Sequence, residues 1–243
     1  MFWFDEIDYR HPTQIEEQMS TEQPKKTPRY IVLSGKKQVG KDTAAGMIRR
    51  VLENEGKRVA EFAFAKPLKD MCVQILGISR EGAYGTDAQK NALSHIVWDG
   101  MPPAVRMKYA KVPDTTVGVS NGMIYASPRS GPMTNREVLQ VIGTDIFRSI
   151  YNDVWAKAPF NIEWDVDIVI LTDCRFPNEK SVTEESGGVI IRLERITGLS
   201  DNHISETALD GFTFKNTYHN DGSLQDLEQY IRQVLVEERI ING

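Results

Sequence analysis

Residues 30–43 read Tyr30-Ile31-Val32-Leu33-Ser34-Gly35-Lys36-Lys37-Gln38-Val39-Gly40-Lys41-Asp42-Thr43, an apolar run followed by two glycines five positions apart and a lysine directly after the second. The apolar run is typical of a buried parallel strand, and apolar residues at helical spacing over 43–55 predict a helix. Glycines permit the backbone angles that turn successive N–H groups toward an anion, and a helix N-terminus favours the same charge. The pattern therefore predicts a loop that binds nucleotide phosphates. A chance glycine turn would explain neither the strand nor the lysine.

The same loop indicates a place for a metal ion. We expect Lys41 to meet the β and γ phosphates, and we assign the donor nucleotide to Gly35, Lys37, Val39, Gly40, Lys41, Asp42 and Thr43. The residue after the lysine usually supplies a hydroxyl to Mg²⁺, but here it is Asp42 and the hydroxyl follows at Thr43. A carboxylate beside phosphates is repulsive without a cation, so Asp42 indicates Mg²⁺ or a basic side chain nearby.

Composition limits the class of protein. The 243 residues are 40% hydrophobic and carry a formal net charge of −5, which argues against general nucleic-acid binding and favours a small anionic ligand. No apolar run is long enough to span a membrane, and the start of the chain has none of the features of a signal peptide. Two cysteines, Cys72 and Cys174, are too few for a disulfide framework. We therefore expect a cytoplasmic protein.

Apolar runs along the chain predict an α/β fold. Residues 1–28 are expected to form a mobile leader, and 29–243 a single domain. Strand-like runs after the first one fall at 58–65, 166–172, 189–193 and 212–218, with helical segments between most of them. This alternation is typical of a central parallel sheet with helices on both faces.

A long insertion at about 79–133 interrupts this alternation. Two strand-like runs, 115–120 and 123–127, flank Asn121-Gly122, which is a strong hairpin signal. A long excursion inside a compact domain is usually functional, so we interpret it as a lid or acceptor-binding segment. A dimer-forming or merely decorative insertion explains the sequence equally well.

A cluster of polar residues follows the strand at 166–172. Asp173 stands at the strand end, where ligands bind in open α/β sheets, and could hold Mg²⁺. It could equally cap a helix. Arg175 can neutralise charge that moves between phosphates, and Glu179 could orient Arg175 or touch the acceptor.

A capping box at Thr134-Asn135-Arg136-Glu137 predicts a helix from 134 to about 151. Polar side chains recur on it at four-residue intervals, namely Arg136, Gln140, Thr144 and Arg148. A solvated face is the ordinary explanation. However, the stripe carries two arginines and no acid, and Gly143 costs a helix about 1 kcal/mol relative to alanine. We therefore expect an acceptor site, with a ligand or another backbone close to Gly143.

Further residues could belong to the site. Trp155 either packs in the core or stacks on a base. Asp145 either structures the local backbone or meets the substrate. Lys66 or Lys69, after the second strand, could touch a phosphate near the glycine loop, although exposed lysines are common.

Five groups of residues occur in a specific order. They are Gly-x4-Gly-Lys-Asp-Thr at 35–43, Phe-Ala-Lys-Pro-Leu-Lys at 64–69, Leu-Gln-Val-Ile-Gly-Thr-Asp at 139–145, Asp-x-Arg-x-x-Asn-Glu at 173–179, and His-Ile-Ser-Glu at 203–206 with Asn-Asp-Gly-Ser at 220–223. Together they resemble the deoxynucleoside monophosphate kinases of tailed bacteriophages, over about 30–235. Asp42 after the loop lysine also matches the variant of that family.

The resemblance implies a phosphate-loop kinase fold and transfer of the ATP γ-phosphoryl group to a deoxynucleoside monophosphate. Its implied catalytic residues are Lys41, Asp173, Arg175 and Glu179; its acceptor residues are Lys69, Arg136, Gln140, Gly143, Thr144, Arg148 and Trp155; its Mg²⁺ residues are Asp42, Thr43 and Asp173. It also makes a homodimer plausible. Two alternatives stay open: a related kinase that acts on phosphomevalonate or dephospho-coenzyme A, and a nucleotide-binding switch without catalysis.

Overall fold

The structure is a computed structural model that describes residues 27–110, 119–120, 123–124, 126–195 and 204–242. Nearly all of the predicted leader (1–28), the Asn121-Gly122 turn and His203 lie outside these residues.

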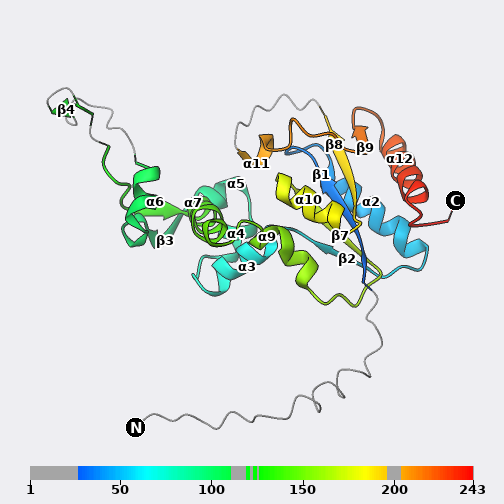
Figure 1. Ribbon diagram of the computed structural model, residues 1–243, viewed down its shortest axis with the longest axis horizontal. Coiled ribbons are helices and arrows are strands. Elements are labelled where there is room, and N and C mark those ends of the chain that lie inside the picture. Colours follow the sequence, from blue (N-terminus) through cyan, green and yellow to red (C-terminus); the bar gives the residue numbers. More distant parts are fainter. Residues whose placement is uncertain (1–26, 111–118, 121–122, 125, 196–203, 243) are drawn as a thin grey trace, which may run out of the picture.

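Five parallel strands form the central sheet, in the order β2-β7-β1-β8-β9 (Figure 1). Their bounds are β1 Arg29–Ser34, β2 Val59–Phe62, β7 Ile168–Cys174, β8 Val189–Glu194 and β9 Asn216–His219. The predicted parallel α/β sheet is therefore confirmed. Several boundaries differ from the prediction: β9 begins four residues later than 212, β2 ends three residues before 65, and β7 begins two residues after 166 and continues through Asp173.

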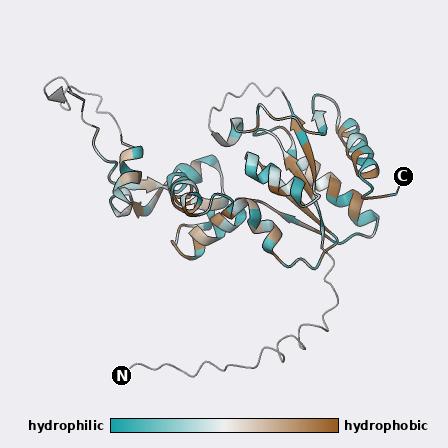
Figure 2. Ribbon diagram, viewed as in Figure 1, coloured by the Kyte–Doolittle hydropathy of each residue, from teal (hydrophilic) through white to brown (hydrophobic). Residues whose placement is uncertain are grey.

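Helices cover both faces of this sheet. The helices α2 (Lys41–Asn54) and α12 (Leu224–Glu237) lie on one face, and α10 (Pro177–Glu185) lies on the other (Figure 1). Side chains of β1 alternate between the two faces, because Ile31 and Leu33 pack with α2 and α12 whereas Tyr30 and Val32 pack in the opposite core. The strands at the centre are accordingly mostly apolar, with polar residues concentrated toward their ends (Figure 2).

A second lobe extends from the β2 edge of the sheet and has its own core. It contains α3 (Lys66–Gln74), α4 (Arg80–Tyr84), α5 (Asp87–Asn91), β3 (Leu93–Val97), a 3₁₀ turn (Trp98–Gly100), α6 (Pro103–Lys108), β6 (Pro132–Thr134) and α7 (Asn135–Gln140). Fully buried Trp98 and Met133 centre this core, and β3 pairs with β6 in an antiparallel sheet. Much of the 79–133 segment thus folds together with α3 and α7 (Figure 1).

The helix predicted over 134–151 is helical throughout but not α-helical throughout. The capping box of Thr134 and Glu137 starts α7 as predicted. From Val141 to Phe147 the backbone is then π-helical, before α8 (Arg148–Ile150) ends it. A short helix α9 (Val154–Lys157) and a 3₁₀ turn (Ala158–Asn161) lead back toward β7.

The remaining elements are short. The strands β4 (Val119–Ser120) and β5 (Met123–Ile124) pair antiparallel, as the predicted hairpin requires. The helix α11 (Ile204–Thr207) precedes β9. Among the described residues, no helix has the length and apolar character needed to cross a bilayer.

Candidate active site

The phosphate loop has the geometry that its glycines predict. Gly35 has a φ of +146°, and a Cβ there would lie 2.4 Å from the carbonyl oxygen of Leu193. Gly40 has a φ of +99°, and a Cβ there would lie 2.5 Å from Nδ2 of Asn220. Both backbone angles therefore disfavour a side chain, and at Gly35 the Leu193 backbone also leaves no space for one. The Asn220 amide also donates to the carbonyl of Val39 at 2.8 Å, so the Asn-Asp-Gly-Ser turn supports the loop.

Lys41 folds back over this loop. Its Nζ donates to the carbonyl oxygens of Gly35 at 2.8 Å and Lys36 at 2.6 Å. Burial, with a smaller contribution from the Arg175 charge, lowers the pKa of Lys41 to about 8. Lys41 thus carries a partly desolvated positive charge at the phosphate loop. The side chain of Val39, in contrast, is buried in the core. Val39 contributes its carbonyl oxygen to the site, where it accepts the Asn220 amide.

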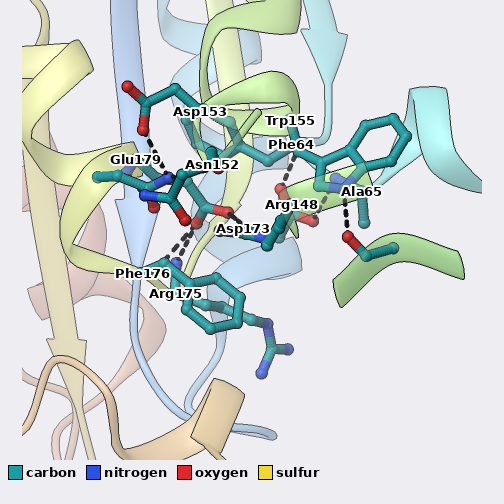
Figure 3. A network of polar contacts seen from close by, with 12 residues as sticks. Phe64, Ala65, Arg148, Asn152, Asp153, Trp155, Asp173, Arg175, Phe176 and Glu179 are labelled. Atoms are coloured by element: carbon teal, nitrogen blue, oxygen red, sulfur yellow. Dashed lines mark hydrogen bonds and ion pairs between the residues drawn. The ribbon is translucent and has the colours of Figure 1, made fainter. Parts of the chain in front are cut away.

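Asp173 joins the end of β7 to the start of α3. Its two carboxylate oxygens accept the backbone N–H groups of Phe64 at 2.6 Å and Ala65 at 3.3 Å (Figure 3). Burial nevertheless raises the pKa of Asp173, against these hydrogen bonds and the charge of Arg175. Asp173 thus lies within β7 and lines the cleft, and it binds two N–H groups just before α3, whereas the N-cap of α10 is Phe176.

Glu179 is 3% exposed and organises the turn before α10. It accepts the backbone N–H groups of Arg175 at 2.8 Å and Phe176 at 3.1 Å, and it lies 3.4 Å from the guanidinium of Arg148 (Figure 3). Burial raises its pKa to about 7. Glu179 thus binds the backbone of Arg175, whereas the guanidinium that it pairs with belongs to Arg148.

The guanidinium of Arg175 reaches toward the phosphate loop instead. It forms an ion pair with Glu206 on α11, and the same Glu206 carboxylate accepts the backbone N–H of Lys37 at 2.7 Å. Arg175 therefore lies beside the phosphate loop, as its predicted role requires.

The polar stripe of α7 and the π-helical segment faces the same cleft. Arg136, Gln140, Thr144 and Arg148 all line it, together with Gly143 and Trp155. Trp155 is 7% exposed, packs 5.3 Å from the ring of Phe147 and donates through Nε1 to the carbonyl of Gly143 at 2.9 Å. Its indole is thus fixed by packing while part of it lines the cleft.

The structure corrects the prediction for the neighbour of Gly143 and decides between the two interpretations of Asp145. The close neighbour of Gly143 is a side chain, since a Cβ there would lie 2.5 Å from Cδ2 of Leu68. Asp145 has the structural role, because it pairs with Lys108 and accepts the hydroxyl of Tyr109 at 2.8 Å.

Lys69 lines the cleft with its Nζ 4.9 Å from the centre of the Tyr84 ring. Burial lowers its pKa, although the Asp173 charge opposes this shift. Lys69 is therefore a partly desolvated cation on the acceptor side.

Residues of α5 belong to the site, although no local motif marks them. Asp87 lies 2.5 Å from Nζ of Lys37 and 2.9 Å from the guanidinium of Arg136, and Asn91 accepts from Nε of Arg136 at 2.9 Å. Asp87, Lys90 and Asn91 all line the cleft. The helix α5 of the insertion thus connects Lys37 of the phosphate loop to Arg136 of α7.

The whole cleft encloses about 1000 Å³ between the sheet and the second lobe. A single small ligand occupies a pocket of about 300–1000 Å³, so this cleft has room for two ligands of moderate size. One end is the phosphate loop and another is the arginine-bearing helix, with Asp173 and Arg175 also in the lining.

Comparison with known proteins agrees with this arrangement. A family model described as deoxynucleotide monophosphate kinase matches residues 111–231. A protein of Acanthamoeba polyphaga mimivirus, provisionally named a deoxynucleotide monophosphate kinase, is 31% identical over 180 residues, which cover 74% of this chain and 81% of the relative. The chain belongs to the deoxynucleotide monophosphate kinase family. The deoxynucleotide monophosphate kinase of Escherichia phage RB69 is 27% identical over 107 residues, 41% of this chain and 44% of the phage protein.

Membership of this family agrees with a cleft that presents cations from both sides. The kinase brings Lys41 and Arg175 from the sheet, and Arg136 and Arg148 from the second lobe.

Proposed function

We propose that this kinase transfers the γ-phosphoryl group of ATP to a deoxynucleoside 5′-monophosphate, which yields ADP and a deoxynucleoside diphosphate. The observation that carries the proposal is that the phosphate loop and the arginine stripe of α7 and α8 line one continuous cleft. Two phosphorylated ligands can then approach each other directly, and no covalent enzyme intermediate is needed.

The donor would occupy the phosphate loop. Loop N–H groups would hold its phosphates, and Lys41 and Arg175 would neutralise charge on the transferring group. The lowered pKa of Lys41 and its hydrogen bonds to loop carbonyls support this role, because a desolvated ammonium interacts strongly with an anion.

The acceptor would lie along the second lobe. Arg136 and Arg148 would hold its monophosphate, with Gln140, Thr144 and Lys69 lining the pocket and Trp155 closing one wall. Arg148 is held in place by the ring of Phe176, 4.4 Å away, and by Glu179. A side chain restrained in this way loses little further freedom when it binds a phosphate.

The residues at the loop fit Mg²⁺, because Asp42, Thr43 and Asp173 supply oxygen atoms to the cleft and Mg²⁺ usually needs only one or two protein oxygens besides phosphates. These residues would hold Mg²⁺ beside the donor phosphates, where a divalent cation would offset part of their negative charge. Asp173 is already placed by two N–H donors, which fixes the direction of its carboxylate.

Two properties of the whole protein also stay proposals. The cysteines Cys72 and Cys174 are both buried free thiols, which is compatible with the cytoplasm as the site of the reaction. A homodimer is testable by sedimentation of the full chain.

The test is an assay of ADP release with Mg·ATP and each of the four deoxynucleoside monophosphates, alongside ribonucleotides, phosphomevalonate and dephospho-coenzyme A. We expect turnover with at least one deoxynucleotide, and a loss of about a thousandfold in Lys41→Ala protein that remains folded. Turnover with only a non-nucleotide acceptor, or full activity in Lys41→Ala, would contradict the proposal.

A further inference from the structure

The carboxylate of Glu206 engages groups that a phosphate would use. One oxygen accepts the Lys37 N–H at 2.7 Å, and the other pairs with the guanidinium of Arg175. The Glu206 side chain is only 8% exposed, so the carboxylate is largely withdrawn from water. Loop N–H groups and arginines are the common phosphate donors of proteins, and a carboxylate is an anion with similar hydrogen-bonding chemistry.

The segment that carries Glu206 is anchored beside the loop. Asp210 pairs with Nζ of Lys36 at 2.8 Å and lies 3.8 Å from the guanidinium of Arg192. Leu209 between them is buried in the core on one face of the sheet. Glu206 is therefore presented to the loop at a high effective concentration, and any anion that binds there must compete with it.

The kinase proposed above meets a selection problem, since both of its substrates carry phosphate and both enter one cleft. A monophosphate offers a single group to the loop. A triphosphate offers several groups, which can engage Lys41 and further loop N–H groups at the same time. An internal competitor would therefore weaken monophosphate binding at the loop proportionally more than triphosphate binding.

We propose that Glu206 is a specificity-determining residue of the donor loop: an internal anion that excludes monophosphates and is displaced by a polyphosphate, which then takes over Arg175. This proposal rests on the proposed function, because the need to exclude a monophosphate from the loop arises from a monophosphate acceptor. The competition between Glu206 and another anion at the loop exists for any acceptor.

The test measures binding of inorganic phosphate and of tripolyphosphate to the full chain by calorimetry. Glu206→Gln keeps the shape of the side chain and removes its charge, so we expect it to bind phosphate about tenfold more tightly. The gain for tripolyphosphate should be smaller. Glu206→Asp retracts the carboxylate by one methylene and should shift phosphate affinity in the same direction, which provides a second variant if the first folds poorly.

Glu228→Gln is the matched control, because it removes an equal charge from an exposed ion pair with Arg232 on α12, outside the cleft lining. We expect its phosphate affinity to stay within about twofold of wild type. Unchanged or weaker phosphate binding in folded Glu206→Gln would overturn the proposal, and so would an equal gain in Glu228→Gln. A wild-type protein that phosphorylates no deoxynucleotide would overturn the proposed function instead, while the phosphate measurement would still decide the role of Glu206.

Discussion

The guanidinium of Arg148 lies 3.4 Å from the carboxylate of Glu179, and only 15% and 4% of these two side chains are exposed. A buried acid is expensive to ionise unless it is well paired. Glu179 accepts two backbone N–H groups and faces one arginine, yet burial, with the nearby Asp173 charge, still raises its pKa to about 7. The carboxyl of Glu179, with its pKa of about 7, therefore titrates near neutral pH.

This raised pKa makes the stability of the protein depend on pH. Because the folded pKa of about 7 exceeds the ordinary 4.5, the folded state binds more protons than the unfolded state between these values. The free energy of unfolding should therefore fall as pH rises from 4.5 to 7 and level off above. Relative to Glu179→Gln, wild type should lose about 3 kcal/mol across this window. Urea unfolding of both proteins at several pH values measures the difference, and a pH-independent difference would contradict it.

Arg136 and Arg148 should contribute to the acceptor rather than to the donor. We expect Arg136→Ala to raise KM for the deoxynucleotide about tenfold or more, because a charge-assisted contact to phosphate is lost, and to leave KM for ATP nearly unchanged. Steady-state kinetics with each substrate varied in turn measures both values. Arg106→Ala is a suitable control, since Arg106 pairs with Asp99 in the same lobe and is not in the cleft lining. A rise confined to KM for ATP would assign Arg136 to the donor.

Asn220 should affect the affinity for the donor ATP, although it lies far from the phosphate loop in the sequence. Asn220→Ala removes the amide that holds the Val39 carbonyl and that packs over Gly40, so the loop should loosen and ATP affinity should fall severalfold. Ser223→Ala, three residues on, removes the N-cap of α12 and should cost about 1 kcal/mol of stability without changing ATP affinity. Nucleotide titrations and thermal unfolding of both variants separate the two effects. Equal losses of ATP affinity would show that the turn acts only through overall stability.

Gly143 and Leu68 should be energetically coupled. Gly143→Ala places a methyl against Leu68 and should destabilise the fold by about 1 kcal/mol or more despite the better helix propensity of alanine. In the Leu68→Ala background the same change should be neutral or stabilising. A double-mutant cycle on the free energy of unfolding should give a coupling of at least about 0.5 kcal/mol. Additive effects would mean that the helix relaxes away from Leu68.

Local patterns were sufficient to predict the sheet, the glycine loop and the polar face of the helix that begins at Asn135. Each depends on residues that are close in sequence, such as the glycines around Lys36 to Val39 or the four-residue spacing from Arg136. The position of Asp173 at a strand end, where it lines the cleft, also followed from the sequence, because parallel strands end together.

Sequence patterns assigned no role to Asp87 or Glu206, because their contacts join distant segments. Asp87 meets Lys37 across 50 residues, and Glu206 meets Lys37 across 169. An acid on a short helix has the same local sequence pattern whether it faces solvent or a phosphate loop, so no periodicity distinguishes the two. The neighbour of Gly143 was misjudged for the same reason, since Leu68 reaches it only through the packing of α3 on the second lobe.

The π-helical stretch from Val141 to Phe147 determines the directions in which Arg136 and Arg148 point around the helix axis. Twelve residues of regular α-helix would leave Arg148 rotated by about 120° from Arg136 around the axis. The wider π turn winds more slowly and reduces this angular drift, so both arginines open onto one cleft. The number of residues per helical turn is thus a variable independent of side-chain identity. A relative that gained or lost one residue in this stretch could redirect Arg148 toward a differently shaped acceptor while it kept every side chain of the stripe.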